Sequence, residues 1–221
     1  MKLEARDISF QYDNGNRRIL NEVSLALTSK DRLGLLAPSG FGKTTFCKIL
    51  AGYERPDSGQ VLLDGRPLEG YRGYCPVQMI WQHPELSVNP RRKMKAVLAE
   101  GDRIPERVIR GLGIEPDWLG RYPGERSGGE LKRFCIARAL GERTRFLLAD
   151  EISTMLDLVT QSQLWQFLLE EVKERQIGLL VVSHSEPLLK RLCTQTINLW
   201  EEQAHGRKDA AFAGEKWGNG S

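Results

Sequence analysis

Three short apolar runs without polar alternation predict buried strands of a parallel sheet, ending near Leu36, Ala149 and Val182. The first run follows a charged turn at residues 31–32, and residues 46–50 after it carry apolar side chains at helical spacing. A strand, a loop and a helix thus follow one another near the N-terminus. The pattern predicts an α/β fold with a parallel core.

Two additions to this core follow from the order of the elements. The region around Tyr12 is expected to form antiparallel strands at the N-terminus. Residues from about 83 to 138 are interrupted by prolines and glycines, so we expect an inserted helical subdomain with short helices. We expect one domain over residues 1–205 and a flexible tail over 206–221, because the C-terminal residues lack a periodic apolar face.

Composition narrows the classes of function. The 221 residues are 40% hydrophobic, enough for a core, and the net charge of +3 from 32 basic and 29 acidic side chains argues against a nucleic-acid partner. The basic run at 91–93 is more typical of a solvated face than of an anion site. No run approaches the roughly 18 apolar residues of a membrane span, and the N-terminus lacks the apolar core of a signal peptide, so we expect a cytosolic chain. The four isolated cysteines indicate reduced thiols rather than a zinc site.

Residues 37–45 read Ala-Pro-Ser-Gly-Phe-Gly-Lys-Thr-Thr, close to the phosphate-binding pattern G-x-x-x-x-G-K-[ST]. Backbone N–H groups and a helix N-terminus in such a loop bind polyphosphate, Lys43 reaches the β- and γ-phosphates, and the Thr44 hydroxyl ligates Mg²⁺. Ala37 replaces the first glycine, and a glycine-rich turn of no function is the alternative. The nucleotide-binding candidates here are Ser39, Gly40, Phe41, Gly42, Lys43, Thr44 and Thr45.

Two acids end the apolar run of residues 146–149. Carboxylates at the C-terminal end of a buried parallel strand have a Walker B arrangement: Asp150 would hold Mg²⁺, and Glu151 would polarise the water that attacks the γ-phosphate. The alternative is a simple turn at the end of the strand. The phosphate-binding loop around Lys43 favours the catalytic interpretation.

Residues 122–140 place Ser127-Gly128-Gly129 at the start of an amphipathic helix that ends in Ala-Arg-Ala-Leu. Ser127 would cap this helix, and the glycines would expose N–H groups to a phosphate presented by another chain. The segment resembles the signature of the ATP-binding cassette (ABC) ATPases. An ordinary serine-capped helix is the alternative.

Other positions match the motifs of that family in sequence order. By resemblance, Gln82 senses Mg²⁺ and the attacking water, Asp157 contacts the opposite subunit, His184 contacts the γ-phosphate, and Tyr12 stacks on adenine. A histidine after a strand is more often a plain loop residue, and an aromatic such as Tyr12 can be a core residue of an edge strand. The resemblance implies the ABC ATPase fold, with ATP and Mg²⁺ as cofactors.

Residues 81–91 and 156–161 resemble ATPases of the oligopeptide, dipeptide and nickel importers. This resemblance implies a subunit that hydrolyses ATP to energise import of peptide, nickel or a metal chelate through a permease. It also implies a second ABC ATPase in a heterodimer, an extracytoplasmic solute-binding protein acting indirectly, and a peripheral position on the cytoplasmic face of a bacterial-type membrane.

Departures from the family pattern leave alternatives open. Arg126 and Glu130 replace the leucine and glutamine of the signature, and Ile152 and Met155 replace a proline and an alanine. An ATPase of a soluble complex, such as an accessory subunit of phosphonate breakdown, is one alternative, and a regulatory subunit with little turnover is another. Because the catalytic positions are kept, we expect a hydrolytically competent half-site on this chain.

Overall fold

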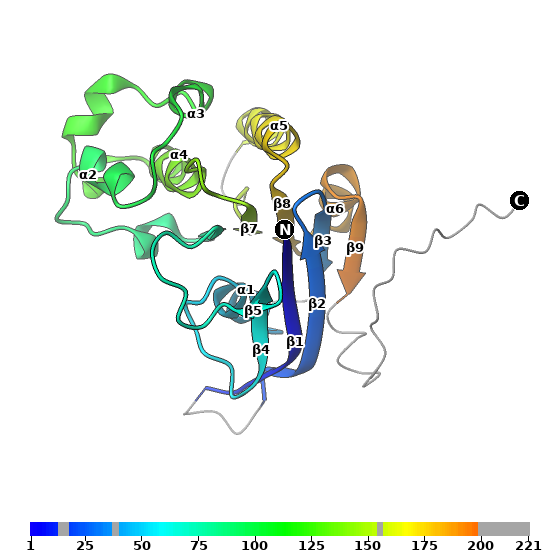
Figure 1. Ribbon diagram of the computed structural model, residues 1–221. Helices are drawn as coiled ribbons and strands as arrows, with labels where there is room; N and C mark the ends of the chain where they lie inside the picture. Colours follow the sequence, from blue (N-terminus) through cyan, green and yellow to red (C-terminus); the bar gives the residue numbers. More distant parts are fainter. Residues whose placement is uncertain (13–17, 37–39, 154–156, 199–221) are drawn as a thin grey trace, which may run out of the picture.

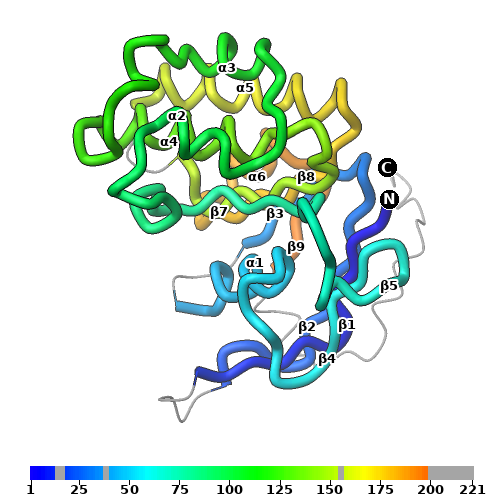
Figure 2. Tube along the Cα trace, turned by 60° about the vertical axis from the view of Figure 1, so that its left-hand side comes forward, coloured from blue at the N-terminus to red at the C-terminus, as the bar shows by residue number. Residues whose placement is uncertain are grey.

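The computed structural model describes residues 1–12, 18–36, 40–153 and 157–198 of the chain. The predictions made at Ala37, Ser39 and Met155, and for the tail over 206–221, lie outside the described residues. In both views the helices α2 (Met94–Ala99), α3 (Glu106–Gly111) and α4 (Gly128–Ala139) gather at one end of the molecule, and an antiparallel sheet lies at the other (Figure 1 and Figure 2).

A parallel sheet of five strands, in the order β6-β7-β8-β3-β9, forms the core. Its strands are β3 (Arg32–Leu36), β6 (Val77–Ile80), β7 (Phe146–Asp150), β8 (Gly178–Ser183) and β9 (Gln195–Asn198). Asp150 pairs with Val182, and Leu36 pairs with Ser183. The carboxyl ends of β3, β7 and β8 therefore meet at one edge, where ligands bind in open α/β sheets.

The parallel sheet is buried on both faces, as its uninterrupted apolar runs predict. Leu148 and Leu180 pack toward one cluster, which includes the helix α1 (Lys43–Leu50) and the antiparallel strands. Leu147 and Leu179 each precede one of these leucines in the same strand and pack into the other cluster. That cluster includes residues of α4, α5 (Leu158–Arg175) and α6 (Glu186–Leu192).

The predicted antiparallel region is a four-stranded sheet in the order β2-β1-β4-β5. Its strands are β1 (Lys2–Phe10), β2 (Leu20–Thr28), β4 (Ser58–Leu63) and β5 (Arg66–Pro67). The register shifts between Ala5 and Ile8, around Asp7, whose φ is 52°. Gly59 lies opposite with a φ of 83°, where a Cβ atom would overlap the carbonyl oxygens of Arg6 and Asp7. This irregularity therefore requires glycine on β4.

The helical part of the fold is built from short elements, as the prolines and glycines predict. Its helices are α2 (Met94–Ala99), α3 (Glu106–Gly111) and α4 (Gly128–Ala139), with 3₁₀ turns at Pro84–Ser87, Pro116–Gly120 and Pro123–Glu125. Each of the three turns begins at a proline, whose fixed φ suits the first position of a helical turn. Across the described ranges, no helix is long and apolar enough to cross a membrane.

Candidate nucleotide-binding site

The glycine-rich loop leads into α1 in a conformation that only glycine takes readily. Gly40 and Gly42 have φ angles of 82° and 83°, and Gly42 is the residue immediately before the helix. A Cβ atom on Gly42 would also overlap the side chain of Ile19. Phe41 packs against the first core cluster, which anchors the loop between the two glycines. The local sequence thus places the N-terminal N–H groups of α1 beside the loop.

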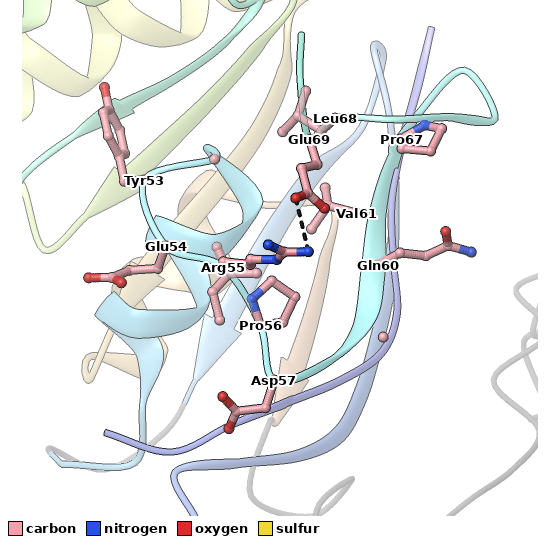
Figure 3. A pocket seen from close by; sticks show the side chains of 13 residues that line it. Tyr53, Glu54, Arg55, Pro56, Asp57, Gln60, Val61, Pro67, Leu68 and Glu69 are labelled. Carbon is pink, nitrogen blue, oxygen red and sulfur yellow. Dashed lines mark ion pairs between the residues drawn. The ribbon is translucent and has the colours of Figure 1, made fainter. Parts of the chain in front are cut away.

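A hollow of about 300 Å³ lies at this edge of the sheet. It is lined by Ile19, Gly40, Gly42, Lys43, Thr44, Thr45, Gln82 and Glu151. A larger hollow of about 570 Å³ lies between the loop after α1 and the β4–β5 hairpin (Figure 3). Its rim carries the exposed ion pair of Arg55 and Glu69, with atoms 3.2 Å apart, but none of the predicted catalytic residues. Three of the four predicted catalytic residues, Lys43, Gln82 and Glu151, instead line the smaller hollow.

Asp150 lies at the end of β7 and is 1% exposed. The hydroxyl of Thr44 donates a hydrogen bond of 2.6 Å to its Oδ2. Burial raises the pKa of the Asp150 carboxyl and the charge of Glu151 adds to this, while the Thr44 hydrogen bond and the cations of α1 oppose it. Burial and a neighbouring acid are the usual reasons for a raised pKa of a carboxyl group.

Oδ1 of Asp150 is buried and has no hydrogen-bond partner among the described residues. A buried oxygen without a partner is costly unless something else binds it. Together with the hydroxyl of Thr44 and the amide of Gln82, it offers the hard oxygen ligands that Mg²⁺ prefers. The residues present fit that ion.

Glu151 follows β7 with a φ of 46°, an uncommon backbone conformation for a residue with a side chain. Its N–H donates to the carbonyl oxygen of Val182 at 3.1 Å, which holds the residue to the end of β8. Such strain is retained where the surrounding structure fixes it, and it clusters at active sites.

Three predicted site residues converge on the Glu151 carboxylate. Nζ of Lys43 lies 3.5 Å from Oε1, and Nε2 of Gln82 lies 3.4 Å from Oε2. Nδ1 of His184, which follows β8, lies 3.4 Å from Oε1. The lysine, glutamine and histidine come from three separate segments of the chain. The structure therefore brings the four predicted catalytic residues together.

The Tyr12 ring packs edge-on against Phe10, and its hydroxyl lies 3.1 Å from Oγ1 of Thr45. Tyr12 is 40% exposed, so the ring is not a core residue. The hydrogen bond places it beside the first turn of α1. Stacking of this ring on adenine stays a prediction.

The Ser127 segment does not line the hollow. Ser127 caps α4: its Oγ accepts from the Glu130 N–H at 3.2 Å, and the Glu130 carboxylate accepts from the Ser127 N–H at 3.0 Å. Within the described part of the chain, the N–H groups of Gly128 and Gly129 have no hydrogen-bond acceptor. They leave a helix N-terminus that can bind an anion from another molecule.

Asp157 caps α5 by accepting from the N–H groups of Val159 and Thr160 at 3.1 and 3.0 Å. Hydrogen bonds from Thr160 are the main reason that the pKa of Asp157 is lowered. Leu158 and Val159 beside it are 84% and 65% exposed, and their contact with an opposite subunit stays a prediction.

Sequence reasoning missed Ile19, which lines the hollow, because no motif marks a residue that merely packs against a loop.

Comparisons with known proteins identify the family of this chain. The family described as ABC transporter matches residues 20–154. The nickel import ATP-binding protein NikE of Rhodospirillum rubrum is 32% identical over 216 residues, which cover 89% of this chain and 77% of the relative. The peptide transport system ATP-binding protein SapF of Salmonella typhimurium is 30% identical over 232 residues, which cover 95% of this chain and 86% of the relative.

A solved structure, the dimeric post-hydrolysis state of the ATP-binding cassette MJ0796 bound to ADP and Pi, has the same fold. Its TM-score is 0.75 at 19% sequence identity, covering 89% of this chain and 93% of that chain. The predicted fold class is therefore confirmed: a parallel core, an N-terminal antiparallel sheet and an inserted helical part. The chain belongs to the ABC transporter family and is one of its ATPase subunits.

Proposed function

We propose that this chain energises import of nickel, a metal chelate or peptide by hydrolysing ATP in complex with a partner permease. The observation that carries the proposal is the convergence of Lys43, Gln82 and His184 on the Glu151 carboxylate, beside the buried Asp150. A general base, a phosphate-binding lysine and a metal-binding carboxylate at one sheet edge are the groups that phosphoryl transfer to water needs.

Each residue has a separate role in the proposed reaction. Lys43 and the loop N–H groups bind the β- and γ-phosphates of ATP, and Tyr12 stacks on the adenine. Glu151 accepts a hydrogen bond from the attacking water and orients this water in line with the γ-phosphate. His184 contacts the γ-phosphate. Thr44, Gln82 and Asp150 would hold Mg²⁺, which when bound neutralises phosphate charge during transfer.

The site on one chain is half of the proposed working site. Ser127, Gly128 and Gly129 do not line the hollow that holds Lys43, so in this proposal they bind the ATP held by a second ABC ATPase subunit. Closure of the pair around two ATP molecules, and reopening after hydrolysis, would move the permease. We place the complex on the cytoplasmic face of the membrane, with a solute-binding protein acting on its other side.

The choice of cargo rests on the relatives, which are named for nickel import and for peptide transport. Residues 81–91, whose sequence resembles that subfamily, follow β6 and place Gln82 in the hollow. This link between the site and the neighbouring surface supports a role in coupling hydrolysis to a membrane partner.

The test is affinity isolation of the chain carrying Glu151→Gln from gently solubilised membranes in the presence of ATP. We expect two permease proteins and a second, different ATPase to co-purify. Recovery of soluble proteins alone would contradict the importer and favour a non-transport ATPase. Glu170→Gln on the exposed face of α5 is the matched control, because it makes the same chemical change away from the site.

A further inference from the structure

Arg126 precedes the cap of α4 and carries a buried guanidinium group. Its side chain is 3% exposed, its Nη1 lies 3.5 Å from Oε2 of Glu130, and its Cζ lies 5.8 Å from the centroid of the Trp118 ring. Nε is buried without a hydrogen-bond partner among the described residues. Burying a cation with one unsatisfied nitrogen costs free energy, so this position needs an explanation beyond packing.

Glu130, the partner of Arg126, lies in the first turn of α4, and its carboxylate accepts a hydrogen bond from the Ser127 N–H. Among the described residues, the neighbouring N–H groups of Gly128 and Gly129 have no hydrogen-bond acceptor. A carboxylate at a helix N-terminus stabilises the helix. It also repels a phosphate that approaches the same N–H groups, unless a cation neutralises it.

We propose that Arg126 is a positioning residue for the N-terminus of α4. Its guanidinium neutralises Glu130 and holds the carboxylate against the Ser127 N–H, so that Ser127 and the two glycine N–H groups bind a phosphate of the partner subunit's ATP. This inference rests on the proposed function, because it requires the N-terminus of α4 to face a nucleotide held by another subunit.

Charge and packing can be separated by paired substitutions. Arg126→Leu keeps apolar contact with Trp118 but leaves Glu130 as an uncompensated carboxylate. Glu130→Gln keeps an oxygen acceptor for the Ser127 N–H but removes the charge. The double variant has neither charge, so a role in charge compensation predicts rescue, and a role in packing predicts none.

The experiment measures ATP hydrolysis against ATP concentration in the complete complex, isolated with its partner subunits. We expect Arg126→Leu to raise KM for ATP about tenfold, since one uncompensated charge then faces the phosphate. The thermal midpoint should stay close to that of the unaltered complex. Adding Glu130→Gln should return KM to within about twofold of the original value.

A KM unchanged by Arg126→Leu, or one that Glu130→Gln fails to restore, would overturn the proposal. Should the Arg126→Leu chain fail to fold, the double variant and Arg126→Lys decide instead. Both are expected to keep the original KM, and a raised KM in both counts against charge compensation. Hydrolysis that is insensitive to Glu151→Gln would contradict the proposed function itself. If Glu151→Gln abolishes hydrolysis but Glu130→Gln does not restore the KM of the Arg126→Leu complex, only the role of Arg126 is rejected.

Discussion

Nζ of Lys43 lies 3.5 Å from Oε1 of Glu151, although the two residues come from opposite halves of the chain. Their side chains are 6% and 11% exposed, so the pair interacts in a medium less polar than water. The contact places the cation that would bind phosphate next to the carboxylate that would activate water. Lys43 begins α1 and Glu151 follows β7, so the packing of these two elements fixes both the cation and the carboxylate.

Substitutions at Tyr12 should separate stacking from hydrogen bonding. Tyr12→Ala is expected to weaken ATP binding about tenfold, because stacking on an aromatic ring contributes about 1 kcal/mol or more. Tyr12→Phe loses only the contact of 3.1 Å with Thr45 and should bind ATP almost as the original chain does. Equilibrium binding of a fluorescent ATP analogue measures both. Equal losses in the two variants would mean that the hydroxyl, and not the ring, matters.

Asp150→Asn should stabilise the chain without nucleotide or Mg²⁺ at neutral pH. Burial raises the pKa of Asp150 in the folded state, so the folded state binds more protons than the unfolded state between the ordinary and the raised pKa. The free energy of unfolding therefore falls as the pH rises through that window, and the ionised carboxylate is the destabilising form above it.

Urea unfolding of both chains at several pH values checks this expectation. The original chain should lose stability relative to Asp150→Asn as the pH rises from the acidic range, and Mg²⁺ with ATP should stabilise the original chain more than the variant. Asp64→Asn, at an exposed turn between β4 and β5, is the matched control. An Asp150→Asn chain that is less stable at neutral pH would contradict the account of a costly buried charge.

Two glycines, one within β4 and one in the turn between β4 and β5, predict unequal costs for the same substitution. Gly59 has a φ of 83° and no room for a Cβ atom beside Arg6 and Asp7, whereas Gly65 has a φ of 76° and open space around it. Gly59→Ala should reduce the free energy of unfolding by about 3 kcal/mol, and Gly65→Ala by about 1 kcal/mol. Chemical denaturation measures the two losses. Similar values for both variants would show that backbone conformation alone sets the cost.

The sequence predicts the parts of the fold that depend on local pattern. The buried strands predicted to end near Leu36, Ala149 and Val182 are present and end at Leu36, Asp150 and Ser183. The prediction succeeds because a strand covered on both faces needs an uninterrupted apolar run. The helix cap at Ser127 also appears, since capping is decided within a few residues.

Other features depend on contacts between distant segments and could not be predicted. The left-handed backbone of Glu151 depends on the end of β8, where its N–H finds the carbonyl of Val182. The burial of Arg126 depends on Trp118 and on the fold of the helical part. No apolar run marks β9, and its place is set by pairing with β3.

In the proposed function, Glu151 is the residue that activates water for ATP hydrolysis. The most direct measurement is steady-state phosphate release by the assembled complex carrying Glu151→Gln, with the corresponding residue of the partner ATPase disabled and with Glu170→Gln as control. We expect a loss of about a hundredfold or more in kcat, with ATP binding retained, because a general base contributes at least that factor. Unchanged phosphate release would contradict the assignment.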